Sequence, residues 1–94
     1  MLFEWGRKKN ISNIKKHGAS FELAASVFDD PFHLSVLDHK THHEERWVTV
    51  GHCITEKILV VVHTYKEVAN QEIIRIISAR SATKKEKKQY EEGI

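Results

Sequence analysis

The sequence has little cysteine, proline or glycine, with one, one and four of these residues among 94. A single cysteine, Cys53, excludes an internal disulfide and a multi-cysteine zinc site. The longest apolar run, residues 58–62, is far shorter than the ~20 residues that a membrane-spanning helix needs. The N-terminus has neither the basic start nor the apolar stretch of a signal peptide. We therefore expect a cytoplasmic protein with no membrane segment.

The motifs of several enzyme classes are also missing. There is no glycine-rich phosphate loop, nucleophile elbow or dinucleotide fingerprint. Glu44 and Glu45 point to opposite faces of an extended chain, so they make a poor glycosidase pair. His39, His42 and His43 have no established zinc spacing, and a polar hairpin loop explains them without a ligand. We expect no metal and no cofactor.

The composition is that of a globular protein, with 40% hydrophobic and 30% charged residues. A chain of this length predicts one domain, residues 1–94, with a radius of gyration of only ~12 Å. A molecule this small cannot enclose a large substrate. Any polymer it acts on must lie across its surface.

The net charge of +2 conceals a strong division along the chain. Residues 1–20 carry a net charge of +4, residues 21–74 of −5 and residues 75–88 of +5. If the two basic segments meet in the fold, they form one basic face suited to phosphates. Two lysine-rich helices that only face solvent explain the same composition, and both interpretations stay open.

Hydrophobic spacing predicts an α+β fold. A short strand over 2–5 precedes a helix over 7–17, which Gly18 ends, and a second helix that Ser20 caps. Period-two patterns predict strands over 32–37, 46–53, 58–65 and 73–80, with a polar turn over 66–71. Thr83 and Glu86 have the spacing of a capping box, which predicts a last helix over 84–92. The short links favour an antiparallel meander.

Two groups of basic residues are candidates for chemistry. Lys16 and His17 end the first predicted helix, where the helix dipole favours cations, but a cation beside an imidazole also suits a phosphate. Arg46 and Arg80 lie in strands, and an arginine fork holds a phosphate with two hydrogen bonds. Ordinary ion pairs explain these arginines equally well, and for Arg75 we favour the ion pair.

A series of short motifs resembles the BrnT family of type II toxins. Each is weak alone, but the ordered set covers nearly the whole chain: Phe3-Glu4-Trp5, Asn13-x-x-Lys16-His17-Gly18-x-Ser20-Phe21-Glu22-x-Ala24, Val27-Phe28-x-Asp30-Pro31, Glu45-Arg46-x-x-x-x-Gly51, Arg75-Ile76-Ile77-Ser78-Ala79-Arg80-x-Ala82-Thr83-x-x-Glu86 and Tyr90. Two positions depart from the family pattern. Gly6 stands where members usually have aspartate, and Ile54-Thr55-Glu56 stands where they tend to have a glycine.

The resemblance implies a fold like the RelE ribonucleases: a small antiparallel sheet with two N-terminal helices and one C-terminal helix, in the order β-α-α-β-β-β-β-α. It also implies a ribonuclease toxin that halts translation. The implied partner is a DNA-binding antitoxin of the BrnA type, dimeric and bound to the toxin in a hetero-oligomer. Family members keep the lysine and histidine before the glycine and the two strand arginines, here Lys16, His17, Arg46 and Arg80.

These four residues are the expected catalytic groups of a metal-independent RNA cleavage. Arg46 and Arg80 would hold the phosphate, while His17 exchanges a proton and Lys16 stabilises charge or acts as the base. The expected substrate contacts are Lys9, Lys15, Lys84 and Tyr90, the last by stacking on a base. The alternative is a non-catalytic basic module that binds a partner protein or nucleic acid.

Overall fold

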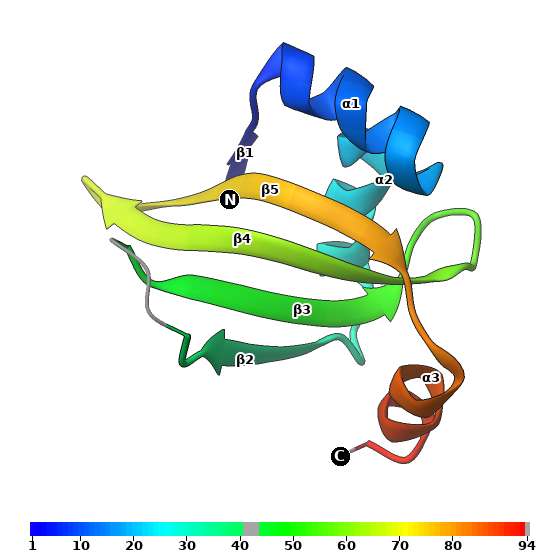
Figure 1. The fold of residues 1–94 in the computed structure, drawn as a ribbon. Coiled ribbons are helices and arrows are strands. Elements are labelled where there is room, and N and C mark those ends of the chain that lie inside the picture. The colour runs from blue at the N-terminus through cyan, green and yellow to red at the C-terminus, as the bar shows by residue number, and fades with distance from the viewer. Residues whose placement is uncertain (41–43, 94) are drawn as a thin grey trace.

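The computed structural model describes residues 1–40 and 44–93. Within them the chain forms a five-stranded sheet and three α-helices, and so confirms the α+β class (Figure 1). The elements in chain order are β1 (Leu2–Glu4), α1 (Arg7–His17), α2 (Phe21–Ser26), a 3₁₀ turn η1 (Val27–Asp29), β2 (Leu34–Asp38), β3 (Arg46–His52), β4 (Ile58–Val68), β5 (Gln71–Ser81) and α3 (Lys84–Glu91).

The sheet is mixed, which corrects the prediction of a wholly antiparallel sheet. Its strand order is β1-β5-β4-β3-β2, and β2 to β5 pair antiparallel as an up-and-down meander. β1 lies beside β5 and runs parallel to it, with Leu2 opposite Ile73. The pairing joins the two ends of the chain, so no local turn or spacing in the sequence signals it.

The hairpin between β4 and β5 corrects a second prediction, the turn over 66–71. Both strands continue through this range, and the turn consists of Ala69 and Asn70, which have φ angles of 51° and 67°. Two successive positive φ values are typical of the two-residue hairpin turns that match strand twist. The polar residues of the range misled the prediction because they belong to exposed ends of strands, not to a loop.

The helix boundaries agree closely with the sequence. Gly18 has a φ of 71° and donates its backbone N–H to Ile14 O, as expected of a glycine that ends a helix. The Ser20 hydroxyl accepts a hydrogen bond from Leu23 N at the start of α2. Thr83 and Glu86 form the predicted capping box of α3. Gly6 is the N-cap of α1 and makes no side-chain cap hydrogen bond, because glycine has no side chain.

Apolar residues pack on both faces of the sheet. α2 and η1 cover one face: buried Phe21 and Ala24 of α2 pack against β4 and β5, and Val27 of η1 packs against β3. α3 covers part of the opposite face, where Tyr90 packs with Ile58, Val60 and Ala82. Phe32 is exposed and precedes β2 instead of belonging to it, so the predicted strand began too early.

Asn13 connects α1 to β5. Its buried side chain donates to the carbonyls of Ala19 and Ala79, at 2.8 Å each, and accepts from Ala79 N at 3.2 Å. The Cα radius of gyration is 12.8 Å, near the ~12 Å expected for a compact chain of this length. No helix of the described residues has the length and hydropathy to cross a bilayer.

Candidate functional site

Arg80 and Glu86 form a bidentate ion pair at the junction between β5 and α3. Arg80 Nη1 donates to Glu86 Oε1 at 2.8 Å, and Nη2 donates to Oε2 at 2.9 Å. A longer hydrogen bond of 3.3 Å joins Nη1 to the Ser81 carbonyl. The capping box fixes Glu86 at the same time, since its Oε1 accepts from Thr83 N at 2.8 Å. The start of α3 therefore holds the guanidinium in one orientation.

This ion pair uses only part of the donor capacity of Arg80. A guanidinium has five N–H groups, and Glu86 and Ser81 together take three of them. The remaining two, on Nε and Nη2, lie on one edge, and no partner for them is found among the described residues. The side chain is 43% exposed. Arg80 can therefore present a two-donor edge to a phosphate while Glu86 holds its other edge.

The same ion pair shifts the acidity of both groups. The hydrogen bonds from Arg80, opposed by partial burial and helped by Thr83, lower the pKa of Glu86 to about 2. The hydrogen bonds to Glu86 raise the pKa of Arg80. Both groups stay charged at neutral pH, so the pair is a fixed feature of the site.

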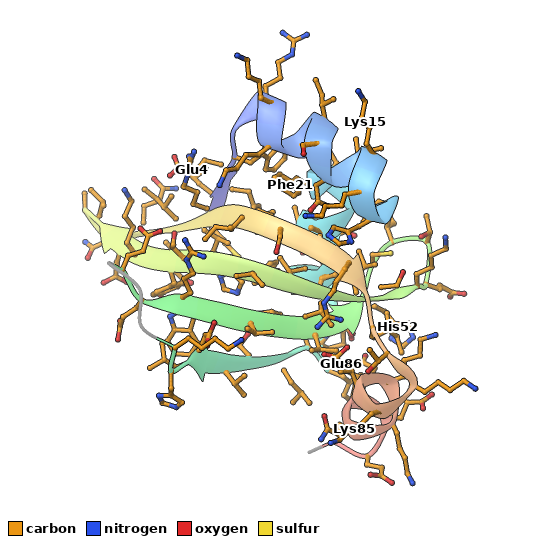
Figure 2. The ribbon with its side chains drawn as sticks, viewed as in Figure 1. Glu4, Lys15, Phe21, His52, Lys85 and Glu86 are labelled. Carbon is orange, nitrogen blue, oxygen red and sulfur yellow. The ribbon has the colours of Figure 1, made fainter. Side chains whose placement is uncertain are left out.

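A second polar cluster lies at the same junction of sheet and helix: Asp30, His52 and Tyr90. Tyr90 donates its hydroxyl proton to Asp30 Oδ2, and His52 Nδ1 lies 2.9 Å from the tyrosine oxygen. The carboxylate also accepts the backbone N–H groups of His52 at 2.8 Å and Phe32 at 2.9 Å. Figure 2 shows His52 and Glu86 at this junction, where the sheet meets α3.

The acidities in this cluster follow from burial and hydrogen bonding. Burial alone would raise the pKa of Asp30, but hydrogen bonds from Tyr90, His52 and Phe32 outweigh it and lower the pKa. Burial and the hydrogen bond to Asp30 raise the pKa of Tyr90 to about 12. Asp30 is therefore an ionised acceptor and Tyr90 a neutral donor at neutral pH.

A groove of about 200 Å³ runs beside these two clusters. Its floor is apolar and its α3 wall carries polar groups; the lining residues are Leu34, Val36, Val48, Val50, Glu86, Gln89 and Tyr90. Both Arg80, through Glu86, and His52, through Tyr90, are thus tied to residues that line the groove.

The structure places Lys16 and His17 elsewhere, along the edge of β5. Both are exposed in the last turn of α1 and line a hollow of about 210 Å³ with Lys9, Ser12, Asn13, Ile77 and Ser78. The hollow includes neither Arg46 nor Arg80. Since Asn13 bonds the backbone of Ala79, this hollow still borders the strand end that carries Arg80.

Arg46 opens β3 at the far end of the sheet, opposite Asp38 of β2. In the sheet register, Arg46 lies two inter-strand spacings and four residues along the strand from Arg80, which corresponds to about 16 Å between Cα atoms. Its Nε is buried with no hydrogen-bond partner found in the described part of the chain. The two arginines face the same side of the sheet.

The expected substrate contacts also differ in their surroundings. Lys9, Lys15 and Lys84 are exposed on helices, and Figure 2 shows Lys15 on the side of α1 away from the sheet. Tyr90 is only 8% exposed and its hydroxyl is bonded to Asp30. Little of its ring is therefore free to stack on a base. α1, from basic segment 1–20, and α3, from basic segment 75–88, lie on two sides of the end of β5 (Figure 1).

His63, Trp5 and Arg75 have structural roles. His63 is buried and bonded to Thr49 and the Thr64 carbonyl, as a sheet histidine should be. Trp5 packs edge-on against Phe21, and Arg75 pairs with Glu4 at 3.8 Å. Of the histidine cluster, His42 and His43 lie outside the described residues. Among residues 1–40 and 44–93 no three potential metal ligands are grouped to hold an ion.

Sequence reasoning missed Asp30 and His52 as site residues. The sequence offers one indication for Asp30, because it precedes Pro31 in a motif of the resemblance. The same two residues are equally explained as the end of a helix. Nothing in the sequence points to His52, because its hydrogen bonds join it to Asp30 and Tyr90, 22 and 38 positions away.

Comparison with known proteins identifies a family and a similar solved structure. The sequence model described as "Ribonuclease toxin, BrnT, of type II toxin-antitoxin system" matches residues 5–86. The crystal structure of the Brucella abortus ribonuclease toxin BrnT superimposes with a TM-score of 0.54 and 24% sequence identity, over 89% of this chain and 100% of that one. At this sequence identity the structural similarity supports the fold alone. The search of curated proteins gives no match.

Proposed function

This chain belongs to the BrnT family, the ribonuclease toxins of type II toxin-antitoxin systems, and we propose that it cleaves RNA in that capacity. The proposed reaction needs no metal: the ribose 2′-hydroxyl attacks its own phosphate, and the 5′-oxygen leaves. One proton must leave the 2′-hydroxyl and one must reach the 5′-oxygen, and the protein must stabilise charge on the nonbridging oxygens. Cleavage of messenger RNA in this way would inhibit translation.

The observation that carries the proposal is the edge of Arg80. Glu86 fixes the guanidinium, which is partly exposed, and Glu86 and Ser81 leave two of its N–H groups for a ligand. A positioned donor pair of this kind stabilises a phosphorane better than a mobile lysine does, because it costs no reorganisation during the reaction. Arg46 would contact a neighbouring phosphate, since it lies on the same side of the sheet.

Lys16 and His17 complete the proposed site from the edge of β5. RNA that crosses the end of this strand would meet Arg80 from one side and the α1 hollow from the other. Lys9 and Lys15 on α1, and Lys84 on α3, would add sequence-independent attraction to the backbone. Tyr90 has a different part in this proposal, as a support for the groove wall instead of a stacking platform.

Cleavage assays with Arg80→Lys test this proposal. The variant keeps the positive charge but loses the paired N–H donors of the guanidinium. We expect it to cut a single-stranded RNA more slowly by roughly 10²-fold, the effect of losing one oxyanion donor. Arg75→Lys is the matched control, because Arg75 is an exposed arginine of the same strand and should leave the rate unchanged. A wild-type rate for Arg80→Lys would refute the role of the fork.

The absence of a metal requirement is tested in the same assay. A chelator should leave cleavage by the purified protein unchanged. Inhibition that a divalent metal reverses would replace the proposed mechanism by a metal-dependent one. Binding of RNA with no cleavage under either condition would favour the alternative, a non-catalytic basic module.

The family also implies an antitoxin, and we propose a small DNA-binding partner of the BrnA type, dimeric in the complex. Its acidic residues would lie against the basic segments 1–20 and 75–88 and cover the RNA path. Co-expression with the neighbouring gene, followed by purification, should yield a stable complex that no longer cuts RNA. A product that does not co-purify, or a complex that cuts as fast as the free protein, would contradict this.

A further inference from the structure

We propose that His52 is the catalytic base that removes the proton of the 2′-hydroxyl, and that Asp30 and Tyr90 are its positioning residues. The inference rests on the proposed ribonuclease function and assigns a residue to it that the sequence did not suggest. It starts from a cluster whose three members come from separate parts of the chain: the turn after η1, the end of β3 and α3.

The hydrogen bonds of the cluster fix the tautomer of His52. Tyr90 has one hydroxyl proton, and it is donated to Asp30. The tyrosine oxygen can therefore only accept from His52 Nδ1, 2.9 Å away, so Nδ1 carries the proton of the neutral ring. Nε2 is left with its lone pair. This is the form of the imidazole that accepts a proton.

Burial makes this arrangement rigid on one side and open on the other. The Asp30 side chain is only 8% exposed, whereas the His52 side chain is 44% exposed. The His52 ring packs edge-on against Tyr90, with ring centroids 5.2 Å apart. The imidazole is thus held through Nδ1 against the protein, and its exposed part is available to a substrate.

The cluster also stabilises the charge that the reaction creates. When Nε2 takes a proton, the ring becomes cationic, and the ionised Asp30 carboxylate lies 3.7 Å from Nδ1. The Tyr90 hydroxyl bridges the two groups and keeps its own proton. This is the arrangement in which a carboxylate orients a catalytic histidine and stabilises the imidazolium.

The position of His52 relative to Arg80 suits one nucleotide. In the sheet register Val50, Val60 and Arg80 form a row, and His52 lies on the same face two residues beyond Val50. The corresponding Cα separation is about 12 Å. Side chains of this length can reach a ribose hydroxyl and its phosphate from two sides. The α1 hollow with His17 lies against the opposite edge of β5 and offers no such carboxylate support.

The proposed step exchanges one phosphorus–oxygen bond for another. The 2′-oxygen forms a bond to phosphorus as its proton passes to His52 Nε2, and the bond from phosphorus to the 5′-oxygen breaks. The products are a 2′,3′-cyclic phosphate and a 5′-oxygen that takes a proton from solvent. The imidazolium then returns its proton to solvent, which restores the starting state.

Chemical rescue provides the test. His52→Ala keeps the backbone N–H that bonds Asp30, so the fold should survive. We expect its cleavage rate to fall by roughly 10²–10⁴, the usual contribution of a general base, and to recover in part when free imidazole is added. His39→Ala removes another exposed histidine and should cut RNA at the wild-type rate, without any effect of imidazole.

The positioning role has its own readout. Tyr90→Phe keeps the buried ring but removes the hydroxyl that orients Nδ1, so kcat should fall while KM for the RNA stays unchanged. A merely structural role would change thermal stability and leave kcat as it is.

Three results would overturn the inference. They are a wild-type rate in His52→Ala, a loss of activity in it that imidazole does not restore, and rescue confined to His17→Ala, which would move the base to α1. In all three cases the wild type still cuts RNA, and the proposed function stands. A wild-type protein that does not cut RNA at all refutes the function and this inference together.

Discussion

At the scale of single residues, the side chains around α3 serve two purposes. Glu86 caps the helix through Thr83 and also holds Arg80, so one carboxylate couples the start of the helix to the proposed phosphate contact. Asp30 accepts from Tyr90 on α3 and from the backbone of β3, and so ties the helix to the sheet. Loss of either carboxylate charge would affect stability and the site together.

The depressed pKa values of Glu86 and Asp30 predict how stability depends on acid. A carboxyl whose pKa is lower in the folded state contributes stability above its unfolded pKa, and this contribution is lost as the pH falls through the folded value. For Glu86 the window runs from 4.5 down to about 2, and Asp30 shifts in the same direction from 3.8. We expect the free energy of unfolding to fall progressively below pH 4.5.

Urea unfolding between pH 2 and 6 measures this, with Glu86→Gln as the comparison. The variant lacks the titrating group, so its stability should be less sensitive to pH over the same interval. Since the ion pair is partly exposed, its loss should cost at most ~1 kcal/mol at neutral pH. Identical pH profiles for the two proteins would show that the pair contributes nothing to acid sensitivity.

At the scale of elements, the turn between β3 and β4 contains a residue that the backbone conformation does not favour. Glu56 has a φ of 68°, in the left-handed region, and belongs to segment 54–56, where the resemblance to the family led us to expect a glycine. The turn is closed by hydrogen bonds from Glu56 N to Cys53 O and from Cys53 N to Lys57 O, both 2.8 Å. The departure noted in the sequence therefore marks a strained turn.

Glu56→Gly should relieve this strain and raise the free energy of unfolding by up to ~1 kcal/mol, less the entropy that glycine adds to the unfolded chain. Glu67→Gly, in the interior of β4, is the control and should lower stability, because glycine weakens a strand. Thermal unfolding of both variants measures the effect. A lower melting temperature for Glu56→Gly would show that the glutamate stabilises the turn in another way.

Gly51 of β3 is required by close packing, not by its φ angle. A Cβ at this position would come within 3.0 Å of Val27 Cγ1 and His33 Cβ, and within 3.1 Å of Asp30 Oδ2. We expect Gly51→Ala to destabilise the fold by about 1–3 kcal/mol, the usual cost of overpacking. Because the added methyl also pushes on Asp30, the cleavage rate should fall with it. Unchanged stability would show that η1 moves freely away from β3.

At the scale of the whole molecule, the basic segments predict how RNA binding depends on salt. An uncleavable RNA with 2′-methoxy groups should bind more weakly as salt increases, because lysine and arginine release counterions from its phosphates. Loss of one phosphate contact, as in Lys16→Gln, should make the slope of log K against log salt shallower by about 0.7. Lys66→Gln, from the acidic middle region, should leave it unchanged. Equal slopes for both variants would place the RNA path away from α1.

Local patterns in the sequence determined the elements of this protein. The helix ends at Gly18, Ser20 and Thr83 depend on hydrogen bonds between residues at most four positions apart, so the sequence displays them directly. Runs of apolar residues likewise predicted where β3 and β4 begin, because these strands pack in a core. The resemblance to the BrnT family, carried by ordered motifs, agrees with the family match over residues 5–86.

Only the tertiary structure decided which functional groups meet. The parallel pairing of β1 with β5 and the placement of Lys16 apart from Arg46 depend on contacts between distant parts of the chain. Asp30, His52 and Tyr90 come together across separations of 22 to 60 positions. Such contacts arise from the packing of η1 and α3 on the sheet. A periodic pattern in the sequence indicates only which side of a helix or strand is buried, not which residues it packs against.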